Sequence, residues 1–252
     1  MNLGLEGKRA LVMGSTRGMG RGIAERLSSE GAEVAVCGRK LADAEEVASG
    51  LNAGTAYSLD LSDSASVATL IADVSTDFGG LDIVVCNGGG PPPGNIADVV
   101  AETWITQFQS MFVNQLAIVN AFLPDMRERR WGRIIVVSSS GIVQPIPNLG
   151  ISNAIRASQV GWAKTLSSEV APDGVTVNTV APGRIHTDRV NHIDAAAAKN
   201  QNKPVEDIAR ASHATIGTVA EFADTAVYLM SDNASYITGS VIKVDGGMIR
   251  GV

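Results

Sequence analysis

The sequence predicts a single doubly wound α/β domain of the Rossmann type, in which helices cover both faces of a parallel sheet of about seven strands. Short runs of β-branched residues alternate with segments of helical period along the whole chain. Most of these runs lack polar alternation, as expected of parallel strands that are covered on both faces. We find no internal repeat and no low-complexity linker, so we expect residues 1–252 to form one unit.

The strands are expected in the short apolar runs, and the helices in the periodic segments between them. The strand runs are residues 9–13, 33–37, 56–59, 83–86, 134–137, 175–180 and 241–244. The helical segments are residues 20–29, 41–51, 64–78, 103–130, 152–171 and 220–231.

Residues 186–218 break this rhythm. They follow the sixth strand, are polar, and are long for a connection between two elements. Long loops at the carboxyl edge of such a sheet commonly cover a ligand. We therefore expect this segment to be a substrate lid.

Composition excludes several classes of function. The net charge of −6 and the lack of a dense Lys/Arg stripe argue against nucleic-acid binding. Cys37 and Cys86 each end an apolar run, which predicts buried thiols rather than a disulfide or metal pair. His186, His192 and His213 lack metal-ligand spacing, so no metal site is expected. The N-terminus lacks a signal-peptide pattern, and no apolar run approaches the roughly 18 residues of a membrane span. We expect a cytoplasmic protein.

A glycine-rich loop, GSTRGMG at residues 14–20, follows the first strand and opens an amphipathic helix. Glycines let the backbone turn sharply and let a pyrophosphate approach the helix N-terminus, where free N–H groups favour anions. In this position the loop predicts a dinucleotide site. The expected contacts from it are Gly14, Ser15, Arg17, Gly18, Met19 and Gly20.

The end of the second strand indicates which dinucleotide binds. An acidic residue there would accept the ribose hydroxyls of NAD and repel a 2′-phosphate. This chain instead has Arg39 and Lys40, and Arg17 lies on the same side. Each cation alone would be read as an ordinary surface charge, but arginine grips phosphate through paired donors, and together they favour NADP(H).

Further motifs follow in the order in which they occur in the short-chain dehydrogenase/reductase family, which the chain resembles over essentially its whole length. They are Asp60-Leu61, Asn87-Gly88-Gly89, Pro182-Gly183 with Thr187, Thr238-Gly239, and Asp245-Gly246-Gly247. The resemblance implies that the first pair contacts adenine and that the segment with Thr187 lies beside the nicotinamide. It is strongest to the 3-oxoacyl-carrier-protein reductase-like branch, and it implies a homotetramer. Met13 stands where the family usually has a threonine.

The same resemblance assigns the reacting groups. In the family a serine after the fifth strand binds the substrate oxygen, a tyrosine thirteen residues later transfers the proton, and a lysine four further on binds the nicotinamide ribose. An asparagine in the preceding helix supports a relay water. Ser139 and Asn114 match the serine and the asparagine, whereas Ser152 and Arg156 occupy the places of the tyrosine and the lysine.

These two replacements leave the source of the proton open. A serine hydroxyl is far less acidic than a phenol, whose reference pKa is near 10, and it reaches less far. Arg156 is cationic and can still hold ribose hydroxyls. The interpretation of Ser152 that we favour over catalysis is a helix N-cap. His186 is a second candidate acid, with a surface residue of the lid as the alternative, and a water relay through Asn114 is a third route.

Two functions follow from these residues. The first is an NADP(H)-dependent oxidoreductase that acts on a carbonyl/alcohol pair of a small molecule with a non-standard active site. The second is a silent dinucleotide-binding regulator or partner subunit.

Residues 88–94, which are rich in glycine and proline, are expected to border the crevice that holds the cofactor and the substrate. They form either the wall of a narrow substrate slot or a rigid turn.

Overall fold

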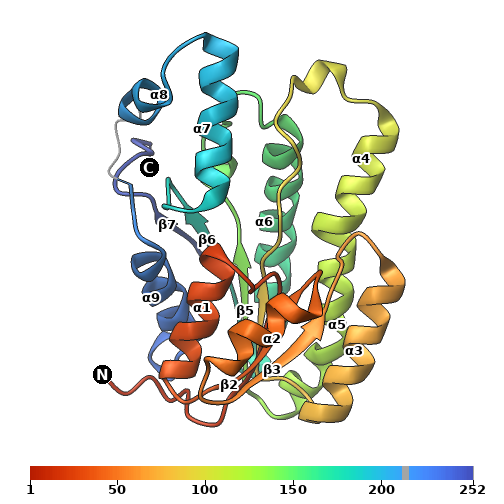
Figure 1. Ribbon diagram of the computed structural model, residues 1–252. Helices are drawn as coiled ribbons and strands as arrows, with labels where there is room; N and C mark the ends of the chain where they lie inside the picture. The colour runs from red at the N-terminus through yellow and green to blue at the C-terminus, as the bar shows by residue number, and fades with distance from the viewer. Residues whose placement is uncertain (212–215, 252) are drawn as a thin grey trace.

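The computed structural model describes residues 1–211 and 216–251. Within them, parallel strands form one seven-stranded sheet in the order β3-β2-β1-β4-β5-β6-β7, as the predicted fold class requires (Figure 1). The strands are β1 (Arg9–Val12), β2 (Glu33–Gly38), β3 (Gly54–Ser58), β4 (Ile83–Cys86), β5 (Gly132–Val137), β6 (Val175–Pro182) and β7 (Val241–Val244).

Helices connect the strands and cover both faces of the sheet. They are α1 (Gly18–Ser29), α2 (Leu41–Ser49), α3 (Ser64–Phe78), α4 (Ala101–Phe108), α5 (Asn114–Glu128), α6 (Gly150–Val170), α7 (Asp188–Gln201), α8 (Val205–Ala211) and α9 (Val219–Met230). Short 3-10 turns span Ile96–Asp98, Ser140–Ile142, Ala171–Asp173 and Asp232–Ala234, and a π-helical turn spans Gln109–Val113. No helix in the described part of the chain is long and apolar enough to cross a bilayer.

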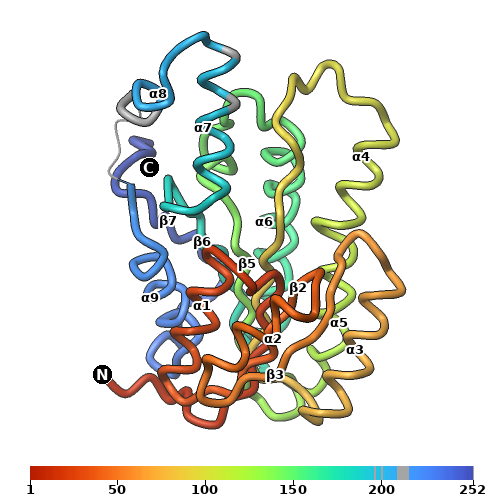
Figure 2. Tube along the Cα trace, viewed as in Figure 1, coloured from red at the N-terminus to blue at the C-terminus, as the bar shows by residue number. Residues whose placement is uncertain are grey.

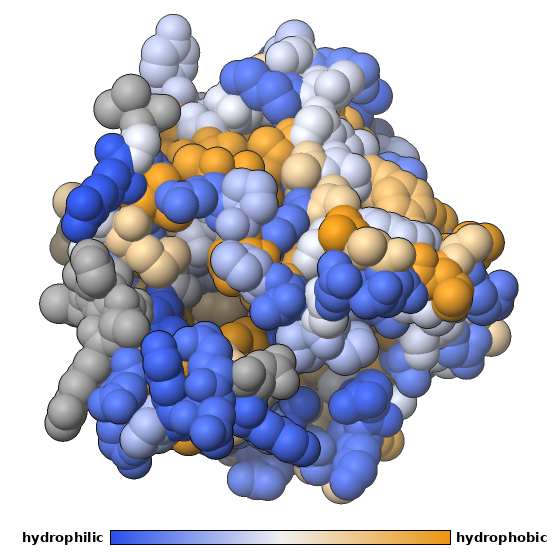
Figure 3. Space-filling model, turned by 90° about the horizontal axis from the view of Figure 1, so that it is seen from above, coloured by the Kyte–Doolittle hydropathy of each residue, from blue (hydrophilic) through white to orange (hydrophobic). Residues whose placement is uncertain are grey.

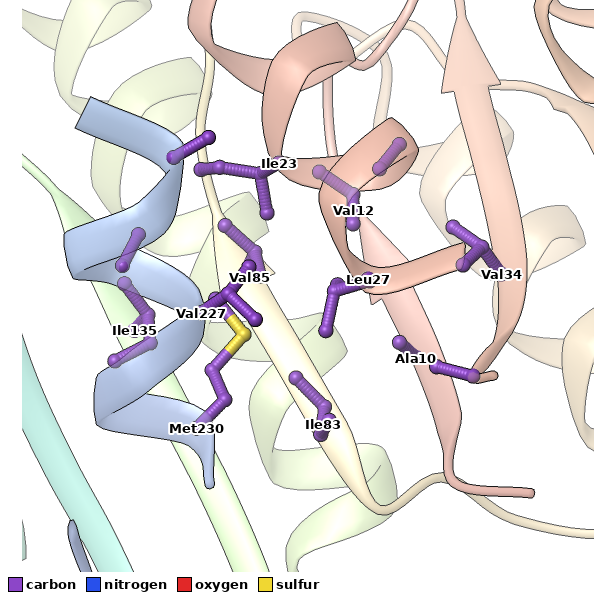
Figure 4. Close-up of a cluster of buried hydrophobic side chains, with 14 of the residues drawn as sticks. Ala10, Val12, Ile23, Leu27, Val34, Ile83, Val85, Ile135, Val227 and Met230 are labelled. Carbon is purple, nitrogen blue, oxygen red and sulfur yellow. The ribbon is translucent and has the colours of Figure 1, made fainter. Parts of the chain in front are cut away.

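Each face of the sheet has its own core, because side chains alternate along every strand. Ala10 and Val12 of β1 point to the layer of α1, α2 and α9, where Leu27 and Val227 close the space between the helices (Figure 4). Leu11 points the other way, into the layer of α3, α5 and α6. Both thiols, Cys37 and Cys86, are buried in this second core.

Strands and most helices agree with their predicted ranges to within two residues, but two segments differ. The predicted helix over 103–130 is interrupted, since the π turn Gln109–Val113 inserts an extra residue between α4 and α5. The predicted lid loop is largely helical and forms α7 and α8, which stand beyond the ends of β6 and β7 (Figure 2). Four consecutive alanines in α7 favour a helix without giving the apolar period that sequence analysis detects.

The strand order places the site. β1 is paired with β2 on one side and with β4 on the other, so the connections leave it in opposite directions. In open parallel sheets, ligands bind at such a switch point, outside the carboxyl ends of the strands. The carboxyl edge, at which all seven strands end, therefore holds the candidate site.

Candidate active site

The glycine loop at the end of β1 is shaped so that only glycine fits. Gly14 and Gly18 have φ angles of +59° and +57°. A Cβ on Gly20 would lie 2.3 Å from the Gly14 carbonyl oxygen. Asn87, one residue after β4, donates through Nδ2 to the carbonyls of Met13 and Gly14 at 2.9 and 3.1 Å. The loop is thus held tightly against β4 and opens onto the N-terminus of α1, as a pyrophosphate requires.

Some side chains of this loop pack inside the protein, and others are exposed at the carboxyl edge of the sheet. Ser15 is buried, and its hydroxyl donates to the Val12 carbonyl at 2.7 Å and accepts the Cys37 N–H at 2.9 Å. Met19 packs against the core of the α1 layer. Arg17 is exposed. The predicted contact through Ser15 is consequently limited to its main chain, whereas the Arg17 guanidinium is free to meet a ligand.

The end of β2 brings a cation and an acid together. Arg39 is exposed directly after the last residue of β2. Asp60 accepts from the main-chain N–H and the hydroxyl of Ser62 at 2.9 and 2.6 Å. These bonds, with the charge of Arg39, hold the pKa of Asp60 below its usual value. Thr16 also packs here, since a Cβ on Gly38 would lie 2.3 Å from its methyl group; sequence analysis missed this contact.

The segment after β6 reaches back over the glycine loop. A Cβ on Gly183 would lie 2.6 Å from the Asp245 Cα, so glycine is required beside the C-terminal turn. The Thr187 methyl lies 3.5 Å from the position of a Cβ on Gly18. Arg184 and the buried Asp194 form a bidentate ion pair, one bond of which measures 3.0 Å, and this pair fixes α7 over the carboxyl edge.

Residues 88–94 follow β4 at the carboxyl edge of the sheet. A Cβ on Gly88 would touch Leu61 and Gln115 at 3.1 Å, whereas Gly89 has open space around it. The far end of the segment is tied to the loop before α6, where the Gly94 N–H donates to the Asn148 carbonyl at 2.8 Å. The glycine- and proline-rich segment is therefore pinned at both ends, next to the start of α6.

Ser139, Ser152 and Arg156 converge at the end of β5. Ser139 is partly buried, and its hydroxyl accepts the Gly141 N–H at 3.1 Å. Arg156 donates through Nη1 to the carbonyl of Val137, the last residue of β5, at 2.8 Å. Its Nε donates to the Ser152 hydroxyl at 3.3 Å, one helical turn away. Ser152 and Arg156 thus lie together at the end of β5, and Ser139 follows that strand by two residues.

The interpretation of Ser152 as an N-cap is wrong. α6 begins at Gly150 and its N-cap is Leu149, which makes no side-chain cap bond. Ser152 lies inside the first turn, buried at 8% exposure, with its oxygen accepting from Arg156. The helix starts earlier than the sequence indicates because the preceding loop pairs with Gly94 and positions residues 149–150.

The Arg156 guanidinium lies in an environment that disfavours its charge. Loss of solvent, followed by repulsion from Arg189, lowers the pKa of Arg156 to about 10. Its hydrogen-bond acceptors are a hydroxyl and a carbonyl, both neutral. No carboxylate pairs with it in the described part of the chain.

Asn114 is buried at the start of α5, where its side chain ties this helix to the loop after β3. Nδ2 donates to the Leu61 carbonyl at 2.8 Å, and Oδ1 accepts from Gln109 at 2.8 Å and from Ser64 at 3.2 Å. These bonds use the side chain for positioning. Its predicted support of a relay water stays a prediction.

His186 lies away from the serines. It is exposed and lines a hollow between α1 and α7, together with Arg21, Glu25 and Asn191. Ser139, Ser152 and Arg156 do not line that hollow. His213 and its neighbours, residues 212–215, lie outside the described residues. Within the described ranges, no group of three His, Cys, Asp or Glu is placed to hold a metal ion.

Two further polar side chains, which sequence analysis did not single out, make defined contacts on α6 and α7. Arg189, near the start of α7, donates to the Pro91 carbonyl at 2.8 Å. Gln159 is buried on α6 and donates to the Met111 carbonyl at 2.6 Å, and its own Oε1 has no partner among the described residues. Gln159 was detectable, because it lies three residues after Arg156 on one helix face. Arg189 carried no such signal.

Seen from above, the carboxyl edge of the molecule is hollowed near its middle, and hydrophilic and hydrophobic residues both border the hollow (Figure 3). A ligand bound there would meet both hydrophilic and hydrophobic residues. Such mixed surroundings suit a small organic substrate that lies against a dinucleotide.

Comparison with known proteins agrees with this architecture. Residues 14–249 match the family model described as enoyl-(acyl carrier protein) reductase. The 3-oxoacyl-[acyl-carrier-protein] reductase FabG of Haemophilus influenzae is 36% identical over 249 residues, which cover 97% of this chain and 99% of that protein. Dehydrogenase/reductase SDR family member 4 of Sus scrofa is 33% identical, over 96% of this chain and 88% of that protein.

Solved structures show the same likeness. L-sorbose reductase from Gluconobacter frateurii, in complex with NADPH and L-sorbose, superposes with a TM-score of 0.93 at 29% identity, and the match covers all of both chains. YwfH, an NADPH-dependent reductase of bacilysin biosynthesis, gives a TM-score of 0.92 at 26% identity, over 98% of this chain and all of that one. The chain belongs to the short-chain dehydrogenase/reductase family of oxidoreductases.

Proposed function

We propose that the protein is an NADP(H)-dependent oxidoreductase of a carbonyl/alcohol pair, in which Ser152 and Arg156 stand in the places of the family's tyrosine and lysine. The observation that carries this proposal is that Arg156 bonds both to Ser152 and to the Val137 carbonyl, which precedes Ser139 by two residues. The dinucleotide loop lies on β1, two strands away across the same edge.

The residues present fit the dinucleotide. A Cβ on Gly20 would collide with the Gly14 carbonyl oxygen, so glycine lets the loop close tightly at the N-terminus of α1, where main-chain N–H groups can meet a pyrophosphate. Arg17, Arg39 and Lys40 are exposed cations available to a 2′-phosphate, and both relatives of known structure named above are NADPH-dependent or NADPH-bound. When bound, NADPH supplies the hydride for the carbonyl carbon. The expected nicotinamide side is bordered by Asn87, Gly183 and Thr187.

The chain's own task is to hold the carbonyl oxygen and to provide it with a proton. Ser139 polarises this oxygen by donating a hydrogen bond. Ser152 accepts a hydrogen bond from the cationic Arg156, which leaves its own O–H free to donate. A hydrogen bond from a cation stabilises the oxyanion form of a hydroxyl and so lowers its pKa. The Ser152–Arg156 pair is therefore the proton donor that we propose in place of a phenol.

The alternative function, dinucleotide binding without turnover, is supported by a different observation. The Asn114 side chain already makes three hydrogen bonds, with Leu61, Gln109 and Ser64, and no phenol lies on α6. A regulator or silent subunit would keep the dinucleotide site and lack the chemistry. Measurement of turnover separates it from the enzyme.

We further propose that residues 1–252 act as one catalytic unit of a cytoplasmic homo-oligomer, a tetramer by family resemblance, that binds neither nucleic acid nor membrane. Exposed apolar side chains gather on and next to α4, which supports a subunit contact there. They include Val100, Ile105, Phe108 and Val113. The net charge of −6 supports the absence of a nucleic-acid partner.

The test is NADPH oxidation by the whole protein with a panel of ketones and aldehydes. Ser139→Ala and Ser152→Ala are expected to lower kcat by about 100-fold or more, the usual contribution of a positioned proton donor. Ser158→Ala on the same helix is the control, because its hydroxyl only returns to the Ile155 carbonyl. Tight NADPH binding without oxidation on any carbonyl would refute the enzyme and favour the silent subunit.

A further inference from the structure

The side-chain amide of Gln159 connects α6 to the helical turn that precedes Asn114. Gln159 is 3% exposed and lies on the buried face of α6, which also carries Ser152. Its Nε2 donates to the Met111 carbonyl at 2.6 Å and to Gln115 Oε1 at 3.1 Å. The Met111 carbonyl can only accept, which fixes the orientation of the Gln159 amide. The amide thus joins α6 to a segment 48 residues earlier in the chain.

Met111 belongs to the π turn that separates α4 from α5. In this turn the main-chain N–H of Asn114 bonds to the Gln109 carbonyl, five residues back instead of four. Such turns are rare, and they occur frequently at functional sites. Asn114 directly follows the turn, so the position of its side chain depends on how the turn is held. Gln159 holds the turn from outside its own helix.

The second acceptor of Gln159 extends this connection to the segment after β4. Gln115 is 4% exposed, and its amide lies against the main chain of Gly88, because a Cβ on that glycine would lie 3.1 Å from Gln115 Nε2. Gly88 immediately follows Asn87, whose side chain holds the glycine-rich loop of β1. The Gln159 amide therefore links α6, the start of α5 and the segment after β4.

The burial of Gln159 is unfavourable for packing alone. Its Oε1 makes no hydrogen bond with the described residues. A buried polar oxygen without a donor costs free energy, and an apolar side chain of similar size would avoid that cost. Its neighbours along the buried face of α6 include the apolar Ile155 and Ala163. A glutamine at this place is therefore explained by the two bonds that its Nε2 donates.

We propose that Gln159 is a positioning residue for the reaction: it fixes the π turn against α6 and thereby sets where Asn114 lies relative to the serine and arginine of that helix. The proposal rests on the function proposed above and adds a residue to it. Ser152 and Arg156 lie within two helical turns before Gln159, on the same side of α6. Displacement of the turn by about 1 Å would misplace the reacting groups, and a misplacement of that size can lower a rate about 100-fold.

The first experiment requires no turnover. Gln159→Met keeps the length of the side chain and removes both hydrogen bonds. Hydrogen exchange of the whole protein, followed by mass spectrometry, should become about fivefold or more faster at residues 109–118, because the turn loses its anchor. Ser167→Ala is the matched control, since this buried hydroxyl of α6 donates to the Lys164 carbonyl of its own helix. Unchanged exchange in Gln159→Met would overturn the proposal.

A double variant separates positioning from support of the fold. Gln159→Met alone leaves Gln115 Oε1 without its donor, and this loss is expected to lower the urea midpoint of unfolding. Gln115→Met combined with Gln159→Met should bring the midpoint back toward that of wild type, because replacing both partners by apolar groups of similar shape is nearly neutral. Its kcat should nevertheless stay as low as that of Gln159→Met. Recovery of kcat together with stability would show a structural role and overturn the proposal.

Steady-state kinetics with a carbonyl that the wild type reduces complete the test. Gln159→Met should lower kcat about 10-fold or more, while KM and the Kd of NADPH change by less than about twofold, because the variant misplaces reacting groups without removing a contact to either ligand. An unchanged kcat, or a loss that appears mainly in KM or in NADPH affinity, would contradict the proposal. A wild type that reduces no carbonyl would refute the proposed function, whereas unchanged exchange in Gln159→Met would refute this inference alone.

Discussion

The two edges of the sheet differ in whether their arginines form ion pairs. At the edge where the strands begin, Arg9 and Arg129 both bond to Asp82, at 2.9 and 3.1 Å, and the neighbouring Arg127 is paired with Asp173. At the carboxyl edge, Arg17, Arg39, Arg156 and Arg189 join no ion pair with the described residues.

This difference distinguishes charged side chains that stabilise the fold from charged side chains that are available to bind a ligand. Asp82 is only 11% exposed in its side chain, and a buried carboxylate is tolerated because several donors surround it. An ion pair within the protein contributes to the stability of the fold whether or not a ligand is bound. An unpaired cation gains a favourable interaction when an anion binds beside it. The four unpaired arginines are therefore candidates for contact with an anionic ligand. Arg184–Asp194 is the exception at the carboxyl edge, and its partners hold the lid.

The largest expected effect is on cofactor choice. Arg39→Asp should weaken NADPH binding by about 100-fold or more and leave NADH binding nearly unchanged, because it removes charge-assisted bonds and adds repulsion of the 2′-phosphate. Fluorescence titration with both cofactors measures this. Lys203→Asp, with the same charge change at an exposed site of the lid, controls for long-range electrostatics. An equal loss for the two cofactors would show that Arg39 does not read the phosphate.

The second effect is on the paired edge. Asp82→Asn should lower the free energy of unfolding by about 2–3 kcal/mol, because it leaves two arginines without their counter-ion. Urea unfolding measures this. Asp224→Asn, which breaks the exposed pair with Arg26, should cost less than about 1 kcal/mol. Similar losses for both variants would mean that Asp82 is no more than a surface charge.

That second effect has a defined pH dependence. Burial alone would raise the pKa of Asp82, but the hydrogen bonds from Arg9 and the charges of Arg9 and Arg129 outweigh it and lower this pKa. A carboxyl whose pKa is lowered on folding stabilises the fold above its unfolded pKa, near 3.9, and loses this contribution as the pH falls through the folded value. The gap between wild type and Asp82→Asn should therefore be full at pH 7 and shrink below about pH 4.

The smallest effect tests the unpaired edge. Arg156→Met should change the free energy of unfolding of the ligand-free protein by less than about 1 kcal/mol in either direction, since it removes an unneutralised cation along with two hydrogen bonds to neutral acceptors. Arg129→Met, which breaks a pair with Asp82, is the comparison and should destabilise more. A loss above about 2 kcal/mol on Arg156→Met would mean that this arginine supports the fold.

Local patterns in the sequence predicted most of the fold. Continuous apolar runs located the strands, and helical periods located α1, α3 and α9, because both patterns repeat within a few residues. They did not reveal the π turn before Asn114, whose extra residue leaves the apolar period nearly intact. They also missed α7, which has little apolar surface to bury and is held by Arg184–Asp194 instead.

The candidate site was predictable to the extent that it follows chain spacing. The four-residue spacing between Ser152 and Arg156 placed them on one helix face, and the glycines of residues 14–20 predicted a phosphate-binding loop. Spacing did not show that Ser15 turns inward, that Asn114 is used for positioning, or that His186 faces α1. Each depends on neighbours far away in the sequence.

The sequence by itself therefore determined the class of fold, the dinucleotide loop, and the presence of serine and arginine where the family has a phenol and an amine. These are properties of short segments, and short segments carry their own signals. Only the tertiary structure decided that Arg156 bonds to the Val137 carbonyl and that no carboxylate among the described residues pairs with it. Nineteen positions separate Arg156 from Val137 in the chain, and their contact depends on where α6 places this side chain at the end of β5.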